Sequence, residues 1–377
     1  MTVGPIELTA IAHGGVAVGR HDGRVVFVRG GLPGETVLVE VTDTTHERFW
    51  RGEVQRVVTA SRHRVIPPCP VAERCGGCDF QFVDVAHQRE LKRQVVAEQL
   101  RRLAGITWTG VVEAVEPDAF GWRTRMRYHR GHEGFGLRAA RSHDVVGLPP
   151  GGCLIASPEG RGRVGGDGDT CTVTVASSGV AVNGVPGVVT QQVGEASFEV
   201  DAEGFWQAHP EAASTLVASV LEVLAPQPGE HALDLFCGVG LFARFLADAG
   251  LQVIGIEGNK GAVAHARTNV PTAVIHAGDV AATLRRIKPS ADVVVLDPPR
   301  AGAGRKCVEQ IAATRPRAVA YVSCDPASLA RDLAYFKQLG YHPDSIRAFD
   351  LYPMTHHVEC VVLLTARAQP GRSTTAD

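Results

Sequence analysis

Alternating hydrophobic and polar residues dominate the beginning of the chain. Short runs of this kind occupy residues 25–28 and 36–41, and glycine-rich turns separate them. Asp22-Gly23 precedes one such run, which is typical of a tight hairpin. Short strands at this spacing predict a small closed β-barrel over residues 1–62.

A helical pattern follows the predicted barrel. Residues 84–104 carry apolar side chains three or four positions apart, with Asp84 placed to cap the helix and Gly105 to end it. Residues 110–200 return to strand-like runs with turns rich in glycine and proline. We therefore expect a β-rich central domain over residues 63–203.

From about residue 205, helical and strand patterns alternate. The predicted elements are helices at 210–224, 241–249 and 259–269, and strands at 231–236, 251–256, 272–276 and 291–296. Such alternation is typical of an α/β domain with a doubly wound, Rossmann-like sheet, which we place at residues 204–366. The tail at 367–377 is rich in Gly, Ser and Thr and is expected to be disordered.

The composition excludes some classes of protein. Hydrophobic residues make up 45% of the chain and charged residues 21%, as in ordinary soluble proteins. No apolar run reaches the length of a membrane span, and the N-terminus lacks the pattern of a signal peptide. We expect a cytoplasmic monomer with no membrane partner. In that reducing compartment the nine cysteines would be thiols, metal ligands or nucleophiles rather than disulfides.

One cysteine stands where chemistry is expected. The apolar run at 318–322 ends in Ser323-Cys324-Asp325-Pro326, and a helical pattern follows. Active sites of open α/β sheets collect at the carboxyl ends of strands, and the positive end of a helix favours a thiolate. The alternative is a small buried hydrophobic side chain, the ordinary role of a free cysteine.

A second strand end carries a glycine loop, Asp234-x-Phe236-x-Gly238-x-Gly240, and Glu257 follows Gly238 by 19 residues. Two glycines do not make the dinucleotide pattern, and no Lys-Ser/Thr pair indicates a P-loop. The motif resembles that of class I S-adenosylmethionine-dependent methyltransferases. A nucleotide or flavin enzyme of similar topology remains the alternative.

The strand predicted at 291–296 ends in Asp297-Pro298-Pro299-Arg300. Methyltransferases that act on exocyclic amines carry an aromatic residue after this motif, so Arg300 speaks against an amine target. A nucleophilic cysteine suggests uracil instead: a thiolate that adds to C6 makes C5 electron-rich, and a base then removes the C5 proton. Glu359 is the candidate base, although a Glu near a strand start is more often a solvated edge charge.

Together these residues resemble the RNA 5-methyluridine methyltransferase family. The matching segments are Asp297-Pro298-Pro299-Arg300, Ser323-Cys324-Asp325-Pro326 and Pro353-x-Thr355-x-His357-x-Glu359. The resemblance implies that Cys324 is the nucleophile and Glu359 the general base. It implies a cofactor site formed by Gln207, Asp234, Phe236, Gly238, Gly240, Leu241, Glu257, Asp279 and Asp297, of which Gln207 and Asp297 could instead contact the substrate. The chain departs from the family at His209 and Asp325, where Asn is usual or common.

A cysteine cluster, Cys69-x5-Cys75-x2-Cys78, indicates a metal site in a cytosolic protein. Sulfur ligands fit zinc or an iron–sulfur cluster, and either requires a fourth ligand. Cys153 is the preferred candidate and Cys171 the second. The motif resembles the [4Fe-4S] motif of larger members of the same family, with zinc as the alternative. The central domain would then be an iron–sulfur domain.

The expected partner is RNA. Arg123, Arg125 and Arg127 alternate, so on a strand they would share one face and could contact phosphates, unless they form only a solvated surface. The glycine pattern near residue 15 resembles a TRAM domain, a small RNA-binding barrel. In the family, a barrel with a cluster accompanies ribosomal RNA more often than transfer RNA. A transfer RNA enzyme, a non-catalytic iron–sulfur RNA-binding protein and a methyltransferase for another base or for protein remain alternatives.

Overall fold

The computed structural model describes residues 1–366, and the predicted disordered tail at 367–377 lies outside them. The chain forms two compact units, each assembled from several segments. The first unit comprises Met1–Glu98, Val111–Val175 and Asp350–Val358. The second comprises Gln99–Gly110, Ala176–Phe349 and the chain from Glu359 onward. Among the helices of residues 1–366, none combines the length and apolar character that crossing a membrane requires.

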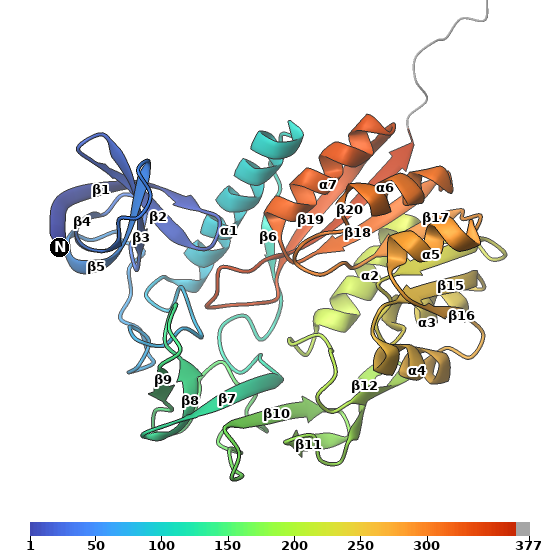
Figure 1. The fold of residues 1–377 in the computed structure, drawn as a ribbon, viewed down its shortest axis with the longest axis horizontal. Helices are drawn as coiled ribbons and strands as arrows, with labels where there is room; N and C mark the ends of the chain where they lie inside the picture. Colours follow the sequence, from blue (N-terminus) through green and yellow to red (C-terminus); the bar gives the residue numbers. More distant parts are fainter. Residues whose placement is uncertain (367–377) are drawn as a thin grey trace, which may run out of the picture. The chain divides into compact units, whose positions relative to one another are not determined.

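The N-terminal part of the first unit is a closed barrel with the strand order β1-β2-β3-β5-β4 (Figure 1). Its strands are β1 (Thr2–Ala12), β2 (Val16–His21), β3 (Arg24–Arg29), β4 (Thr36–Asp43) and β5 (Phe49–Thr59). Alternate side chains point inward, and the core they form consists of Ile6, Leu8, Ala17, Val26, Val28, Val37 and Val39. Asp22 and Gly23 join β2 to β3 with φ angles of 47° and 77°, as a tight hairpin requires. The predicted barrel is confirmed.

Helix α1 (Val85–Gln99) follows the cysteine-rich segment, and the chain continues into a π-helical turn, η1 (Leu100–Ala104). The carboxylate of Asp84 accepts a hydrogen bond from the N–H of His87 at 2.8 Å, so it caps the helix as predicted. Gly105 has a left-handed φ of 61° and ends the helical segment. The helix predicted at 84–104 is confirmed.

A segment from near the end of the chain, Asp350–Val358, completes the first unit. Lys92 of α1 is fully buried, and its ammonium donates to Asp350 Oδ1 at 2.5 Å. Gln88 of the same helix accepts a hydrogen bond from the N–H of Met354 at 2.9 Å. A buried charge is tolerated only when it is paired, so α1 and this segment depend on each other.

The central part of the first unit is a second β-sheet region. Its strands are β7 (Arg125–Gly131), β8 (Gly134–Arg138), β9 (Val145–Gly147) and β10 (Thr170–Ala176). The short strand β6 (Val112–Ala114) does not belong to this sheet. β7 pairs antiparallel with β8 and β10. Met126 and Tyr128 are buried, so Arg125 and Arg127 lie on the opposite face of β7. Arg123, the third member of the predicted stripe, precedes the strand.

The second unit contains a twisted sheet in which β16-β15-β14-β17-β18 run parallel, followed by β20 and β19. β20 is antiparallel to both β18 and β19. The strands are β14 (His231–Leu235), β15 (Gln252–Glu257), β16 (Val274–Ala277), β17 (Val293–Leu296), β18 (Ala318–Ser323), β19 (Tyr341–Asp350) and β20 (Glu359–Ala366). Both β17 and β18 are buried along their whole length, as expected of strands covered on both faces.

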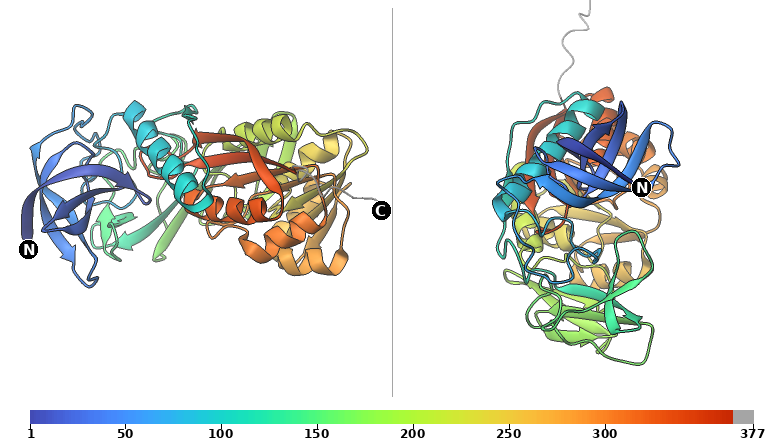
Figure 2. Two further views of the ribbon diagram at one scale, coloured as in Figure 1. Left: turned by 90° about the horizontal axis from the view of Figure 1, so that it is seen from above. Right: turned by 90° about the vertical axis from the view of Figure 1, so that its left-hand side faces the viewer.

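Helices cover this sheet on two sides, with α2 on one face and α5, α6 and α7 on the other (Figure 2). The helices are α2 (Ala212–Leu224), α3 (Leu241–Asp248), α4 (Lys260–Asn269), α5 (Val280–Ile287), α6 (Gly304–Ala313) and α7 (Pro326–Gln338). Three short strands precede them: β11 (Gly179–Val182), β12 (Val188–Val193) and β13 (Ala196–Asp201). The predicted doubly wound sheet is confirmed, and each predicted helix and strand of this region overlaps an observed one.

Candidate active site

The glycine loop joins β14 to α3 through unusual backbone conformations. Phe236, Gly238 and Gly240 have positive φ angles of 60°, 54° and 92°. A Cβ added to Gly240 would lie 2.8 Å from the side chain of Val270, so α4 approaches the loop too closely for a larger residue. A Cβ added to Gly238 would meet nothing within 4 Å. The loop therefore has open space at Gly238, where a ligand could approach the backbone.

Asp234 lies at the end of β14 and is fully buried. Its Oδ2 accepts a hydrogen bond from the N–H of Ala243 at 2.7 Å, whereas Oδ1 has no partner among the described residues. Burial raises the pKa of Asp234 to about 8, although the bond from Ala243 opposes the shift. An unpaired buried oxygen is costly, so this position fits a donor or cation supplied by a ligand.

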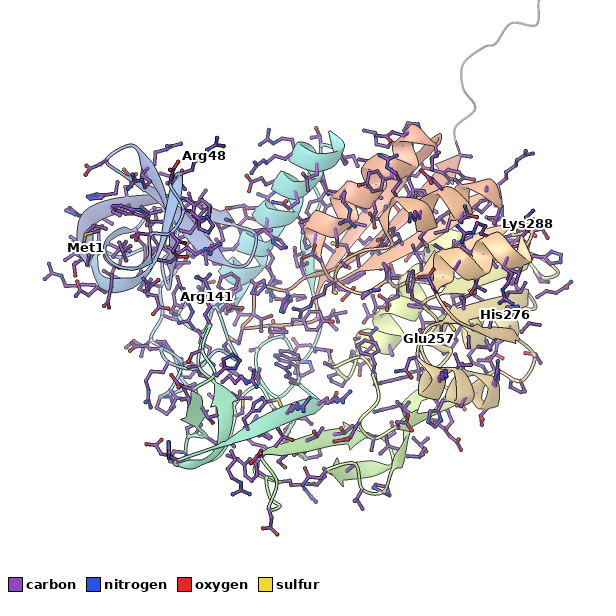
Figure 3. All side chains as sticks on the ribbon, in the orientation of Figure 1. Met1, Arg48, Arg141, Glu257, His276 and Lys288 are labelled. Carbon is purple, nitrogen blue, oxygen red and sulfur yellow. The ribbon has the colours of Figure 1, made fainter. Side chains whose placement is uncertain are left out.

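Glu257, labelled in Figure 3, is the last residue of β15. One carboxylate oxygen accepts the N–H of Gly238 at 3.0 Å and the other accepts the N–H of Asn259 at 2.7 Å. The structure therefore brings Glu257 to the glycine loop. Asp279 lies at the end of the next strand, where it caps α5 by accepting the N–H of Ala282 at 2.8 Å.

Asp297 follows β17 and faces Gln207, whose amide donates to its Oδ2 at 3.4 Å. Desolvation raises the pKa of Asp297 to about 7, against the hydrogen bond from Gln207. His209, two residues after Gln207, is buried, and its Nδ1 accepts the N–H of Glu211 at 3.1 Å. The imidazole thus supports the turn before α2, a task that the family's Asn could also perform.

Cys324 lies between β18 and α7 and is partly exposed. Asp325 caps α7 by accepting the N–H of Ser328 at 2.7 Å, and Asn caps helices equally well, which accounts for this departure from the family. Burial, followed by the charges of Glu359 and Asp297, raises the pKa of Cys324 to about 12.

The expected thiolate is therefore not favoured in the unliganded protein. The positive end of α7 is outweighed by desolvation and by two facing carboxylates. The charge of Arg300 opposes this shift and lowers the pKa of Cys324.

Glu359 begins β20 and is almost fully buried. β18 and β20 pair antiparallel with Ser323 opposite Cys360, so the next pair in register sets Cys324 beside Glu359. The influence of the Glu359 charge on the thiol agrees with this register. The strand topology thus brings together a thiol and a carboxylate that are 35 residues apart in the sequence.

Four cysteines line one small cavity of the first unit: Cys69, Cys75, Cys78 and Cys153. Leu137, Val146 and Leu148 make its walls apolar. Cys171 lies elsewhere, on β10. Within residues 1–366, no three His, Cys, Asp or Glu side chains are arranged to hold a single metal ion.

Comparisons with known proteins agree with this arrangement. A family model described as tRNA (Uracil-5-)-methyltransferase matches residues 282–367, and a TRAM domain model matches residues 2–55. The chain is 41% identical to an uncharacterized RNA methyltransferase of Streptomyces avermitilis, over 97% of this chain and 98% of that protein. It is 30% identical to the 23S rRNA (uracil(1939)-C(5))-methyltransferase RlmD of Shewanella piezotolerans, over 95% of this chain and 94% of that protein.

The chain belongs to the RNA uracil-C5 methyltransferase family. A solved structure with the same fold is the tRNA (uracil-54, C5)-methyltransferase of Pyrococcus abyssi in complex with S-adenosyl-L-homocysteine. Its TM-score is 0.73 at 23% identity, covering 96% of this chain and 99% of that one. As a member of this family, the protein is an RNA-modifying enzyme that uses S-adenosylmethionine, and its N-terminal barrel is a TRAM domain.

One buried residue of this methyltransferase was not predicted. Asp332 lies in α7 among buried apolar residues and bonds to the loop that follows Asp297. The sequence does carry a signal, because an acid at position 332 interrupts the apolar stripe of Leu329, Leu333 and Phe336.

Proposed function

We propose that this methyltransferase forms 5-methyluridine in 23S rRNA through a covalent bond between Cys324 and C6 of the target uracil. The observation that carries the proposal is the strand register that sets Cys324 beside Glu359 at the carboxyl end of β18. A neighbouring thiol and carboxylate are the two groups that alkylation of a pyrimidine C5 requires.

The chain's own residues would act in the following order. The Cys324 thiol gives up its proton to water, the resulting thiolate adds to C6, and the electrons of the C5–C6 double bond make C5 nucleophilic. S-adenosylmethionine supplies the methyl group that C5 accepts. Glu359 then removes the proton from C5, the double bond re-forms and the thiolate leaves. Because Glu359 is buried, its carboxylate is shielded from water while it holds this proton.

The proposed cofactor contacts follow the geometry around β14. The unpaired Oδ1 of Asp234 suits the ammonium of the methionine part, and the open space at Gly238 admits its carboxylate near the backbone. Phe236 and Leu241 flank this loop, and Glu257 would hold the ribose hydroxyls. Asp279 would face the adenine, and Gln207 with Asp297 would contact the cofactor or the uracil.

Ribosomal RNA is the substrate that the relatives favour. The RlmD proteins act on 23S rRNA and match this chain along nearly its whole length at 30% identity. The tRNA enzyme of known structure is less similar in sequence, at 23%. A transfer RNA substrate is the second candidate, since the matching family model is named for tRNA.

The four-cysteine cavity fits a [4Fe-4S] cluster better than zinc. A single zinc ion needs sulfurs about 2.3 Å from one centre, whereas a cluster separates its ligands more widely. Four cysteines line this cavity, the number of thiolates that a [4Fe-4S] cluster takes. The N–H of Gly77 donates to the sulfur of Cys75 at 3.4 Å, and such bonds are common around iron–sulfur clusters. In this proposal, residues 63–203 form an iron–sulfur domain between the RNA-binding barrel and the catalytic domain.

The decisive experiment maps methylated uridines by mass spectrometry in ribosomal and transfer RNA from a strain that lacks the gene. Loss of one 5-methyluridine from 23S rRNA, restored by the wild-type gene and not by Cys324→Ala, is expected. Loss from transfer RNA would establish the second candidate. An unchanged set of methylated uridines would refute both.

The covalent step is tested separately with purified protein. Glu359→Gln should accumulate a protein–RNA adduct, seen as a slow band in a denaturing gel, because the C5 proton stays in place. Cys324→Ala should form none and still bind S-adenosylmethionine. A non-catalytic RNA-binding protein would form no adduct in either variant.

A further inference from the structure

Asp332 is fully buried in the middle of α7. Its neighbours on the helix face are apolar and equally buried, among them Leu329, Leu333 and Phe336. A carboxylate in such a place is costly unless its oxygens are fully hydrogen-bonded. The steps of the proposed reaction do not use this residue.

Asp332 holds the loop that carries Asp297, directly through Oδ2 and by way of Arg331 through Oδ1. Oδ2 accepts the N–H of Ala303 at 2.7 Å and the N–H of Gly304 at 3.1 Å. It also accepts the hydroxyl of Tyr321 at 2.8 Å, and that hydroxyl accepts the N–H of Ala303 at 3.1 Å. Loop, strand β18 and helix α7 therefore meet at one carboxylate oxygen.

The second oxygen extends this contact through Arg331. Oδ1 of Asp332 accepts the Nε and Nη2 groups of Arg331 at 3.0 and 2.8 Å. Nη2 of Arg331 also donates to the carbonyl of Ala301 at 2.7 Å. The backbone of the loop is thus held at three positions within four residues, and charge-assisted bonds of this kind are the stronger ones.

The local sequence explains why the loop needs an external partner. Ala303 stands at the N-cap of α6 and has no side chain that could cap the helix. Asp332 caps it from α7. Gly302 has a φ of 77°, and a Cβ there would lie 2.5 Å from Asp332 Oδ2, so the carboxylate approaches the loop as closely as glycine permits.

The loop carries two charges that act on the nucleophile. Asp297 begins it and raises the pKa of Cys324, whereas Arg300 lowers that pKa. Tyr321 and Asp332 lie on the two elements that flank Cys324. The elements that position the sulfur therefore also hold the loop whose charges face it.

We propose that Asp332 is a positioning residue, which fixes the Asp-Pro-Pro-Arg loop against β18 and α7 so that Asp297 and Arg300 face Cys324. Because Asp332 is fully buried beneath the loop, we assign it no contact with substrate or cofactor. This role rests on the proposed function of Cys324 and Asp297. It differs from a purely stabilising role, because loosening the loop should slow the reaction in enzyme that is fully folded.

The test is the variant Asp332→Asn. Its amide has the size of the carboxylate but can accept hydrogen bonds at only one end, so either the loop or Arg331 loses its acceptor. We expect kcat to fall about 10- to 100-fold, as for a misplacement of about 1 Å, while the KM for S-adenosylmethionine stays within about twofold. Adduct formation can be followed with RNA containing 5-fluorouridine, because the base cannot remove fluorine from C5 as it removes a proton and the adduct persists. The rate of this reaction should fall by the same factor as kcat.

Glu230→Gln is the matched control. Glu230 accepts Arg317 Nε at 2.6 Å in the same unit, so this change removes a bidentate carboxylate–arginine pair that lies away from the loop and nearer the surface. If Asp332→Asn does not fold, Arg331→Gln keeps the carboxylate and its direct bonds to the loop, and removes the bonds of the guanidinium to Ala301 and to Oδ1 of Asp332. We expect Arg331→Gln to slow adduct formation as well.

Two results would overturn the positioning role: a kcat of Asp332→Asn equal to that of Glu230→Gln when both are folded, or an adduct rate of Arg331→Gln equal to that of wild type. An increase of KM alone would count against it too. Failure of the proposed function looks different, since the wild-type protein would then form no adduct with RNA containing 5-fluorouridine.

Discussion

Replacement of Glu359 by Gln should make the Cys324 thiol more reactive. The Glu359 charge is the second largest cause, after burial, of the raised pKa of about 12. Only about one thiol in 10⁴ is then ionised at pH 8, because each pKa unit changes that fraction tenfold. Removal of this charge should lower the pKa by about one unit and raise the thiolate population about tenfold.

The expected gain in rate is smaller than the gain in thiolate. A less basic thiolate is a weaker nucleophile, with a Brønsted coefficient of about 0.4–0.5, so the net gain should be about threefold. The measurement is the second-order rate of iodoacetamide labelling at the Cys324 peptide, followed by mass spectrometry from pH 7 to 10. Peptide resolution separates this site from the other cysteines.

Asp325→Asn is the matched control for this measurement. It removes a carboxylate next to Cys324 and keeps a helix cap, but the charge of Asp325 contributes least to the raised pKa among the causes found. Its labelling rate should therefore stay close to that of wild type. An unchanged or slower rate in Glu359→Gln would refute the reasoning, because the carboxylate could not then face the sulfur.

Three further outcomes are expected. Lys92→Met should lower the free energy of unfolding by about 3–5 kcal/mol in a denaturant titration, since it leaves Asp350 buried without its cation, and Lys92→Met/Asp350→Leu should recover much of this loss. Gly240→Ala should weaken S-adenosylmethionine binding at least tenfold in calorimetry, because the added Cβ pushes α4 away from the loop and resists the positive φ; unchanged binding would contradict this. Cys153→Ser should reduce iron and sulfide in anaerobically purified protein, whereas Cys171→Ser should not; zinc in both would favour the alternative metal.

Local features of the fold could be predicted because local physics decides them. Asp22-Gly23 supplies two left-handed residues next to each other, so a hairpin follows from the sequence alone. The apolar run before Cys324 has no polar face, which identifies a strand covered on both sides. The glycine loop likewise predicts a turn, because Gly238 and Gly240 can adopt positive φ angles.

Features that depend on distant residues could not be predicted. The raised pKa of Cys324 follows first from burial and then from the carboxylates of Glu359 and Asp297, which the sequence places far from it. The partners of Asp332 lie up to 29 residues earlier in the chain, so its role emerges only in the folded sheet. Propensity and spacing carry no information about such neighbours.

The ion pair between Lys92 and Asp350 spans 258 positions of the chain and has a consequence for biosynthesis. Translation delivers Lys92 early and its partner only after most of the other unit has been made. A nascent chain must therefore keep this lysine hydrated until residue 350 has been made. A chain that ends before residue 350 would leave the Lys92 ammonium without its carboxylate partner. Such truncated chains should therefore be degraded by quality-control proteases instead of accumulating.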